Sequence, residues 1–261
     1  MEVIIQPTEQ AAVNLTARIL ADALRRNPEM VFGLATGATM EAVYAELARM
    51  YREDELDFSG AKSFNLDEYI GLPPEDRNSY RYYMNENLFN KINIKLANTH
   101  LPNGMTDDIN GEGERYEAAI QAAGGIDLQL LGIGQDGHIG FNEPLSSLGS
   151  RTRDKALTPE TVKQNSIYFD PPESMPRRAF TMGVGTILEA ERIVMLVTGE
   201  HKADIVAKAV EGPVTSMISA SAIQFHRNAV VIVDEAAAAK LQGQAHYRWS
   251  FVNEPRWEKF R

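Results

Sequence analysis

The chain has 261 residues, carries a net charge of -10 at pH 7 and contains no cysteine. The negative charge argues against a protein that binds nucleic acid through its phosphate backbone, whereas a few cations gathered in one pocket still suit a small anionic ligand. The lack of cysteine excludes disulfides, thiolate chemistry and cysteine-based zinc sites. No apolar run approaches the roughly twenty residues that a membrane span needs, so we expect a protein of the cytoplasm that binds neither nucleic acid nor membrane.

Short apolar runs alternate with stretches of helical periodicity along the whole chain. The expected strands are residues 3–5, 30–34, 61–65, 126–131, 193–197 and 229–233. The expected helices are residues 8–26, 40–52, 78–90, 110–123, 200–211 and 235–247, with Thr8 and Asn110 as N-caps. This alternation predicts a single α/β domain over residues 1–261, built on a mostly parallel, doubly wound (Rossmann-like) sheet with helices on both faces.

Two segments depart from the alternation. Residues 144–180 contain five prolines and are expected to form a lid or a subunit contact. The tail, residues 247–261, carries Trp249, Phe251, Trp257 and Phe260. A tail with that much apolar area is expected to dock on its own domain or on a neighbouring subunit.

A turn of small residues, Leu34-Ala35-Thr36-Gly37-Ala38-Thr39, joins an expected strand to an expected helix. Its backbone N–H groups and the positive end of the helix dipole suit a phosphate group. The turn matches neither a P-loop nor a dinucleotide fingerprint, and a plain strand-to-helix turn explains the pattern equally well.

A second turn, Phe64-Asn65-Leu66-Asp67-Glu68-Tyr69-Ile70-Gly71-Leu72, places two acids directly after a strand. One of them is a candidate general base at the carboxyl end of that strand. The alternative is that Asp67 or Glu68 caps a short helix. The sequence leaves both interpretations open.

A third turn, residues 132–144, combines four glycines with Asp136, His138 and Glu143. Carboxylates near a histidine fix its tautomer and tune its pKa, which favours a catalytic role over a structural one. One imidazole with two carboxylates is a poor zinc set, so we expect no metal. The remaining histidines lack such neighbours and are expected to be structural or solvated: His100, His201, His226 and His246.

In this order and spacing, the three turns closely resemble the glucosamine-6-phosphate deaminase family, also called glucosamine-6-phosphate isomerase. The resemblance continues through residues 150–153, 181–186 and 199–202. It therefore covers nearly the whole chain and is not a chance similarity of one turn.

The resemblance implies a cofactor-free enzyme that isomerises and deaminates glucosamine 6-phosphate, giving fructose 6-phosphate and ammonia. Asp67 matches the base that takes the C2 proton and delivers it to C1 through an enolamine. His138 matches the group that opens the sugar ring, and Asp136 and Glu143 match the acids that hold it. A carboxylate on one face of two adjacent carbons suits such a proton shuttle.

The same resemblance assigns a phosphate site to Thr36, Gly37, Ala38, Thr39 and Lys202. Ala38 stands where the family usually has glycine or serine, which is tolerable only if its φ is negative. Ile167 stands where the family commonly places an arginine. Either Arg177, Arg178 or another cation replaces that arginine, or the substrate differs at its phosphate end.

Some members of the family are hexamers activated by N-acetylglucosamine 6-phosphate at a subunit interface. Ser146, Arg153 and Lys155 match that allosteric site, and Tyr247 lies close to the position of a tail tyrosine involved in it. The resemblance therefore predicts a homo-oligomer, a hexamer in the regulated type. The alternative is a set of surface charges and a tail packed on its own subunit.

Three alternatives to the deaminase remain. Phosphogluconolactonases share a similar Gly-x-Asp-Gly-His turn, but residues 65–72 and 141–144 favour the deaminase. A related amino-sugar phosphate, such as galactosamine 6-phosphate, is harder to exclude because of Ile167. A sugar-phosphate sensor ranks last, because the chain shows no helix-turn-helix segment.

Overall fold

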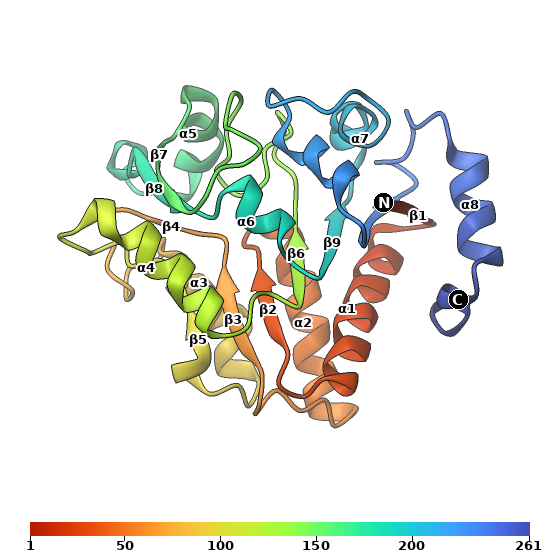
Figure 1. Ribbon diagram of the computed structural model, residues 1–261, viewed down its shortest axis with the longest axis horizontal. Coiled ribbons are helices and arrows are strands. Elements are labelled where there is room, and N and C mark those ends of the chain that lie inside the picture. The colour runs from red at the N-terminus through yellow and green to blue at the C-terminus, as the bar shows by residue number, and fades with distance from the viewer.

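A parallel sheet of seven strands runs through the centre of the protein (Figure 1). The computed structural model describes all 261 residues. The strands are β1 (Glu2–Gln6), β2 (Val31–Leu34), β3 (Lys62–Asn65), β5 (Thr99–His100), β6 (Leu128–Leu131), β9 (Arg192–Val197) and β10 (Ala229–Asp234), in the order β1-β10-β9-β6-β2-β3-β5. Strands of such a sheet are buried on both faces and read as continuous apolar runs. The six strands predicted from such runs are all present, and the α/β fold class is confirmed.

The chain forms eight α-helices, most of which connect successive strands. They are α1 (Glu9–Arg26), α2 (Ala38–Glu53), α3 (Tyr80–Asn87), α4 (Ile109–Ala122), α5 (Pro159–Asn165), α6 (Val184–Leu188), α7 (Ala203–Val210) and α8 (Gln244–Asn253). None of these helices combines the length and apolar character required to cross a membrane. The Thr8 hydroxyl accepts a hydrogen bond from the Ala11 N–H at 3.1 Å, which confirms Thr8 as the N-cap of α1.

Two local predictions were wrong. Asp108, not Asn110, caps α4, because the helix begins one residue earlier and the Asp108 carboxylate accepts the Gly111 N–H at 2.9 Å. The helix expected over 235–247 is replaced by turns followed by α8. Alanines favour a helix, but a bond from the Ala237 N–H to the Asp234 carboxylate closes a local turn after β10 instead.

A small antiparallel sheet lies beside the central one, with the order β4-β8-β7. Its strands are β4 (Asp67–Tyr69), β8 (Arg178–Thr181) and β7 (Arg153–Ala156). Figure 1 shows β7, β8 and α5 at the end of the molecule toward which β2, β3 and β6 point. The segment 144–180 thus contains regular structure above the carboxyl ends of the strands, and its role as a lid or subunit contact stays a prediction.

The C-terminal tail docks on the first strand and helix of the same chain. The Trp257 indole is buried and donates to the Glu2 carboxylate at 2.7 Å. The Arg18 guanidinium donates to the Phe260 carbonyl at 3.1 Å. Docking on its own domain, one of the two expected outcomes, is therefore what the structure shows. Trp249 on α8 is instead 58% exposed.

These two tryptophans make a matched pair for a stability test. Trp257→Ala empties a buried site and is expected to lower the free energy of unfolding by about 3 kcal/mol. Trp249→Ala removes an exposed ring and is expected to cost less than about 0.5 kcal/mol. Urea unfolding followed by far-ultraviolet circular dichroism measures both, and equal losses would contradict the docking of the tail.

Candidate active site

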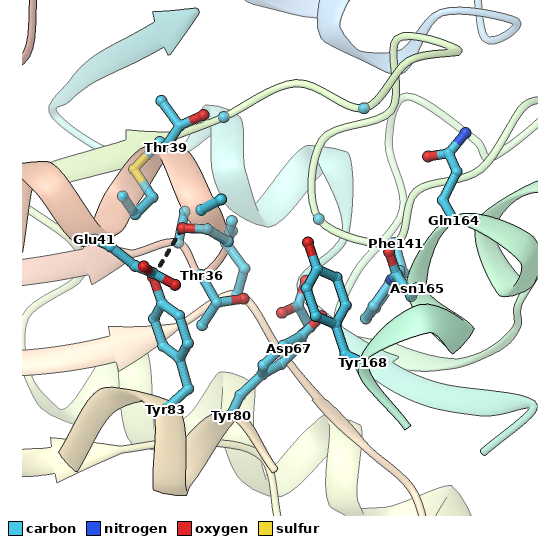
Figure 2. A pocket seen from close by; sticks show the side chains of 18 of the residues that line it. Thr36, Thr39, Glu41, Asp67, Tyr80, Tyr83, Phe141, Gln164, Asn165 and Tyr168 are labelled. Atoms are coloured by element: carbon cyan, nitrogen blue, oxygen red, sulfur yellow. Dashed lines mark hydrogen bonds between the residues drawn. The ribbon is translucent and has the colours of Figure 1, made fainter. Parts of the chain in front are cut away.

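The three turns identified in the sequence line one cavity of about 530 Å³ at the carboxyl ends of the central strands (Figure 2). They meet there because parallel strands all end at the same edge of a sheet, where ligands bind in open α/β folds. The first turn leaves β2, the second leaves β3 and the third leaves β6. A volume of this size accommodates a small-molecule substrate.

The first turn presents the N-terminus of α2 to the cavity. Gly37 is the N-cap and has a φ of 113°, a value that glycine adopts without strain. Its residue type provides no side-chain acceptor, so the first N–H groups of α2 remain available to an anion. Ala38 is already the first helical residue, which meets the condition that its φ be negative. The Tyr83 hydroxyl donates to the Gly37 carbonyl at 2.8 Å and fixes the turn.

Asp67 begins β4 and lines the cavity. Its side chain is buried and accepts no hydrogen bond from any protein group. Burial raises the pKa of Asp67 to about 8, and the neighbouring charge of Glu68 acts in the same direction. A carboxyl group with a pKa close to neutrality can both accept and return a proton.

Glu68, unlike Asp67, binds backbone N–H groups. Its carboxylate accepts the N–H of Tyr69 at 2.8 Å, of Tyr80 at 3.0 Å and of Arg81 at 2.9 Å. Burial raises the pKa of Glu68 to about 7 in spite of these bonds. Glu68 therefore fastens the first turn of α3 to β4. The helix-capping interpretation thus holds for Glu68, whereas the general-base role of Asp67 stays a prediction.

His138 lies between the two acids of the third turn. Its Nδ1 is 2.6 Å from Asp136 Oδ1 and 3.6 Å from Glu143 Oε2. Burial acts to raise the pKa of Asp136, but contact with His138 outweighs it and holds that pKa below its usual value. No protein group binds the other ring nitrogen, Nε2. The ligand atoms of these three residues lie within 4.8 Å of one another, and the absence of a metal stays a prediction.

Two glycines of the third turn allow its backbone to lie close to the His138 ring and to β8. A Cβ on Gly134 would lie 2.4 Å from His138 Cε1, so only glycine fits against the ring. Gly140 has a φ of 57°, and a Cβ there would lie 2.7 Å from Thr181 Oγ1. The third turn therefore closes onto β8, the neighbour of β4 in the small sheet.

The cations expected at the phosphate end divide into two groups. Lys202 lines the cavity and donates through Nζ to the Ile133 carbonyl at 2.9 Å, while burial lowers its pKa. Ile167 is 73% exposed and does not line the cavity. Neither Arg177 nor Arg178 lines it either, and the Arg178 side chain pairs with a carboxylate on β7. The two named replacements for an arginine at position 167 are therefore wrong.

Several lining residues were not identified from the sequence. They are Arg77, Tyr80, Tyr83, Phe141, Gln164, Asn165 and Tyr168. Figure 2 shows Tyr80, Asp67 and Tyr168 beside one another, with Thr36 and Tyr83 on one side and Gln164 and Asn165 on the other. The run of tyrosines at residues 80–83 was a usable signal, but its helical spacing alone assigned it to a helix.

The residues expected at an allosteric site do not form one site within a chain. Ser146 is buried, and Arg153 donates to Asn142 Oδ1 at 2.9 Å. Lys155 shares β7 with Arg153, whereas Tyr247 lies on α8. Figure 1 shows β7 and α8 on opposite sides of the molecule. A site that contains all four residues therefore needs a second copy of the chain.

Comparison with known proteins agrees with this architecture. Residues 6–232 match the family model described as glucosamine-6-phosphate isomerases/6-phosphogluconolactonase, and the chain belongs to this family. A glucosamine-6-phosphate deaminase of Hahella chejuensis is 49% identical over 95% of both chains. The corresponding protein of Rhodococcus jostii is 45% identical over 100% of both.

Solved structures show the same fold. A monomeric glucosamine-6-phosphate deaminase superposes with a TM-score of 0.90 at 42% identity, covering 92% of this chain and 100% of that one. The 6-phosphogluconolactonase of Trypanosoma cruzi has a TM-score of 0.75 at 17% identity, covering 92% and 97%, which shows a shared fold alone.

The raised pKa of Asp67 predicts a specific change of stability with pH. In the folded protein this group stays protonated up to about pH 8, whereas the unfolded chain releases the proton near the ordinary value of 3.8. The folded state binds the extra proton between these values, so this group makes stability fall as the pH rises through that window. Asp67→Asn removes the effect.

We expect the stability advantage of Asp67→Asn over the wild type to grow from about pH 4 to about pH 8 and then level off. Urea unfolding at intervals across this range measures it. Glu75→Gln changes an exposed carboxylate on the nearby turn and serves as the control. An advantage that stays constant with pH would contradict the assigned pKa.

Proposed function

We propose that the protein is a glucosamine-6-phosphate deaminase, an enzyme of amino-sugar breakdown. The observation that carries the proposal is that Asp67, His138 and the N-terminus of α2 line one cavity. Relatives that are 45–49% identical over most of their length carry that name. The cavity supplies a proton-transfer carboxyl group, a histidine held by acids and a place for an anion.

The charges of the cavity orient the substrate. The phosphate group suits the free N–H groups of α2 together with Lys202, because both line the cavity and present positive charge to it. The sugar then extends from this end toward Asp67 and His138. Figure 2 shows the Tyr80 and Tyr168 rings beside Asp67, where they border the space for the sugar.

The reaction begins with opening of the sugar ring. His138 transfers a proton at the ring oxygen of the sugar through Nε2. Asp136 and Glu143 hold Nδ1 and stabilise the imidazole when it is protonated. The resulting open chain has an aldehyde at C1 and an amine at C2. Opening therefore makes the C2 hydrogen acidic, because it now lies beside a carbonyl group.

Asp67 then moves the hydrogen between the two carbons. Its carboxylate takes the C2 proton, which leaves an enolamine, and returns the proton to C1. The product is an imine at C2. Addition of water to this carbon and loss of ammonia give fructose 6-phosphate, so one water is consumed and one ammonia is released. A pKa of about 8 suits both halves of the transfer.

The alternatives differ in substrate or in assembly. Rates with galactosamine 6-phosphate and with a phosphogluconolactone, compared with glucosamine 6-phosphate, separate the three reactions. Activation by N-acetylglucosamine 6-phosphate in a hexamer stays a prediction from the resemblance. The solved relative described as monomeric gives no support to an oligomer.

The purified protein is expected to convert millimolar glucosamine 6-phosphate to equal amounts of fructose 6-phosphate and ammonia. Asp67→Asn and His138→Gln each remove a proton-transfer group and are expected to lower kcat by about 10²-fold to 10⁴-fold. The control, His246→Gln, changes an exposed histidine on α8 and should leave the rate unchanged. A wild-type protein without turnover would overturn the proposed function.

A further inference from the structure

Only two lysine or arginine side chains line the cavity, Lys202 and Arg77. Lys202 is partly buried, and its ammonium group already donates to the Ile133 carbonyl. Arg77 is exposed and forms neither an ion pair nor a hydrogen bond with any other residue. An unpaired guanidinium at the mouth of a cavity has all five of its donors available to a ligand.

The backbone that carries Arg77 is held in place. Arg77 lies in the turn between β4 and α3, two residues before Ser79, the N-cap of α3. The Ser79 N–H donates to the Asp76 carbonyl at 3.0 Å, and the Ser79 hydroxyl donates to the Pro74 carbonyl at 3.1 Å. The carboxylate of Glu68 binds the N–H of Tyr80 directly after it. The position of Arg77 is therefore fixed even though its side chain is free.

The same helix contacts the phosphate-binding turn. Tyr83, one turn into α3, donates its hydroxyl hydrogen to the Gly37 carbonyl. The turn that carries Arg77 and the N-terminus of α2 thus border the cavity as one connected unit. The 3₁₀ turn η3 (Ser166–Tyr168), on the other side of the cavity, contributes no lysine or arginine side chain to the lining.

We propose that Arg77 is the second cation of the phosphate subsite and binds the phosphate oxygens of the substrate together with Lys202 and the α2 N-terminus. This inference rests on the proposed function. A guanidinium binds two phosphate oxygens at once, whereas an ammonium acts as a point charge. Arg77 therefore makes the enzyme select phosphorylated sugars and takes no part in the proton transfers.

The test compares Arg77→Ala with the wild type and with Arg177→Ala, an exposed arginine that lies outside the cavity. Loss of a charge-assisted contact to phosphate is expected to raise the KM for glucosamine 6-phosphate about 10-fold to 100-fold, with kcat changed less than about threefold. Arg77→Lys retains the positive charge but not the two-pronged guanidinium, so its KM should lie between those of the wild type and Arg77→Ala. Arg177→Ala should match the wild type.

Inorganic phosphate provides a second measurement that does not need turnover. Its dissociation constant, measured by calorimetry, should rise in Arg77→Ala by about 10-fold or more and stay unchanged in Arg177→Ala. Unchanged KM and phosphate affinity in Arg77→Ala would overturn the inference, as would a fall in kcat at constant KM. If the wild type lacks turnover, the proposed function fails, and the phosphate titration still decides the role of Arg77.

Discussion

Burial of the Asp67 carboxyl group without a hydrogen-bond donor is the constraint on which the active site depends. A carboxylate moved out of water without compensation is costly, so the group retains its proton to a higher pH. Backbone contacts on both sides of Asp67 keep its side chain in this buried position. Glu68 anchors β4 to α3, and Asp67 itself pairs with Thr181 on β8.

Thr181 also couples the two halves of the site. Its hydroxyl accepts the Phe141 N–H at 2.9 Å, which attaches the turn carrying His138 to the strand that pairs with Asp67. The small antiparallel sheet thereby sets the separation between Asp67 and His138. The central sheet brings the turns to one edge, and the small sheet aligns them. Free N–H groups of α2, together with Lys202 and Arg77 in the cavity lining, give an acidic protein a local site for an anion.

The sequence predicted those parts of the molecule that depend on local patterns. The long apolar runs, such as β9 and β10, identified six strands of the parallel sheet, and the turns after β2, β3 and β6 were correctly expected to share one edge. The strands of the small sheet have three or four residues and no apolar run, so only their long-range pairing defines them.

The roles of individual site residues likewise depend on long-range contacts that local sequence patterns do not predict. The sequence named Asp67 and Glu68 as a pair, but only the position of α3 shows which acid faces the cavity and which one binds the helix. Arg77 carries no local signal, because an arginine in a polar turn is ordinary. Its relevance follows from the contact between α3 and the turn at Gly37, which are about 45 residues apart and meet only in the folded protein.

We propose that one carboxyl group, Asp67, transfers the hydrogen between C2 and C1 on one face of the substrate. Turnover of glucosamine 6-phosphate in heavy water, followed by proton nuclear magnetic resonance of the fructose 6-phosphate, tests it directly. Transfer by a single carboxyl group leaves at most one deuterium per molecule at C1, always in the same stereochemical position. Deuterium distributed over both C1 positions would contradict it.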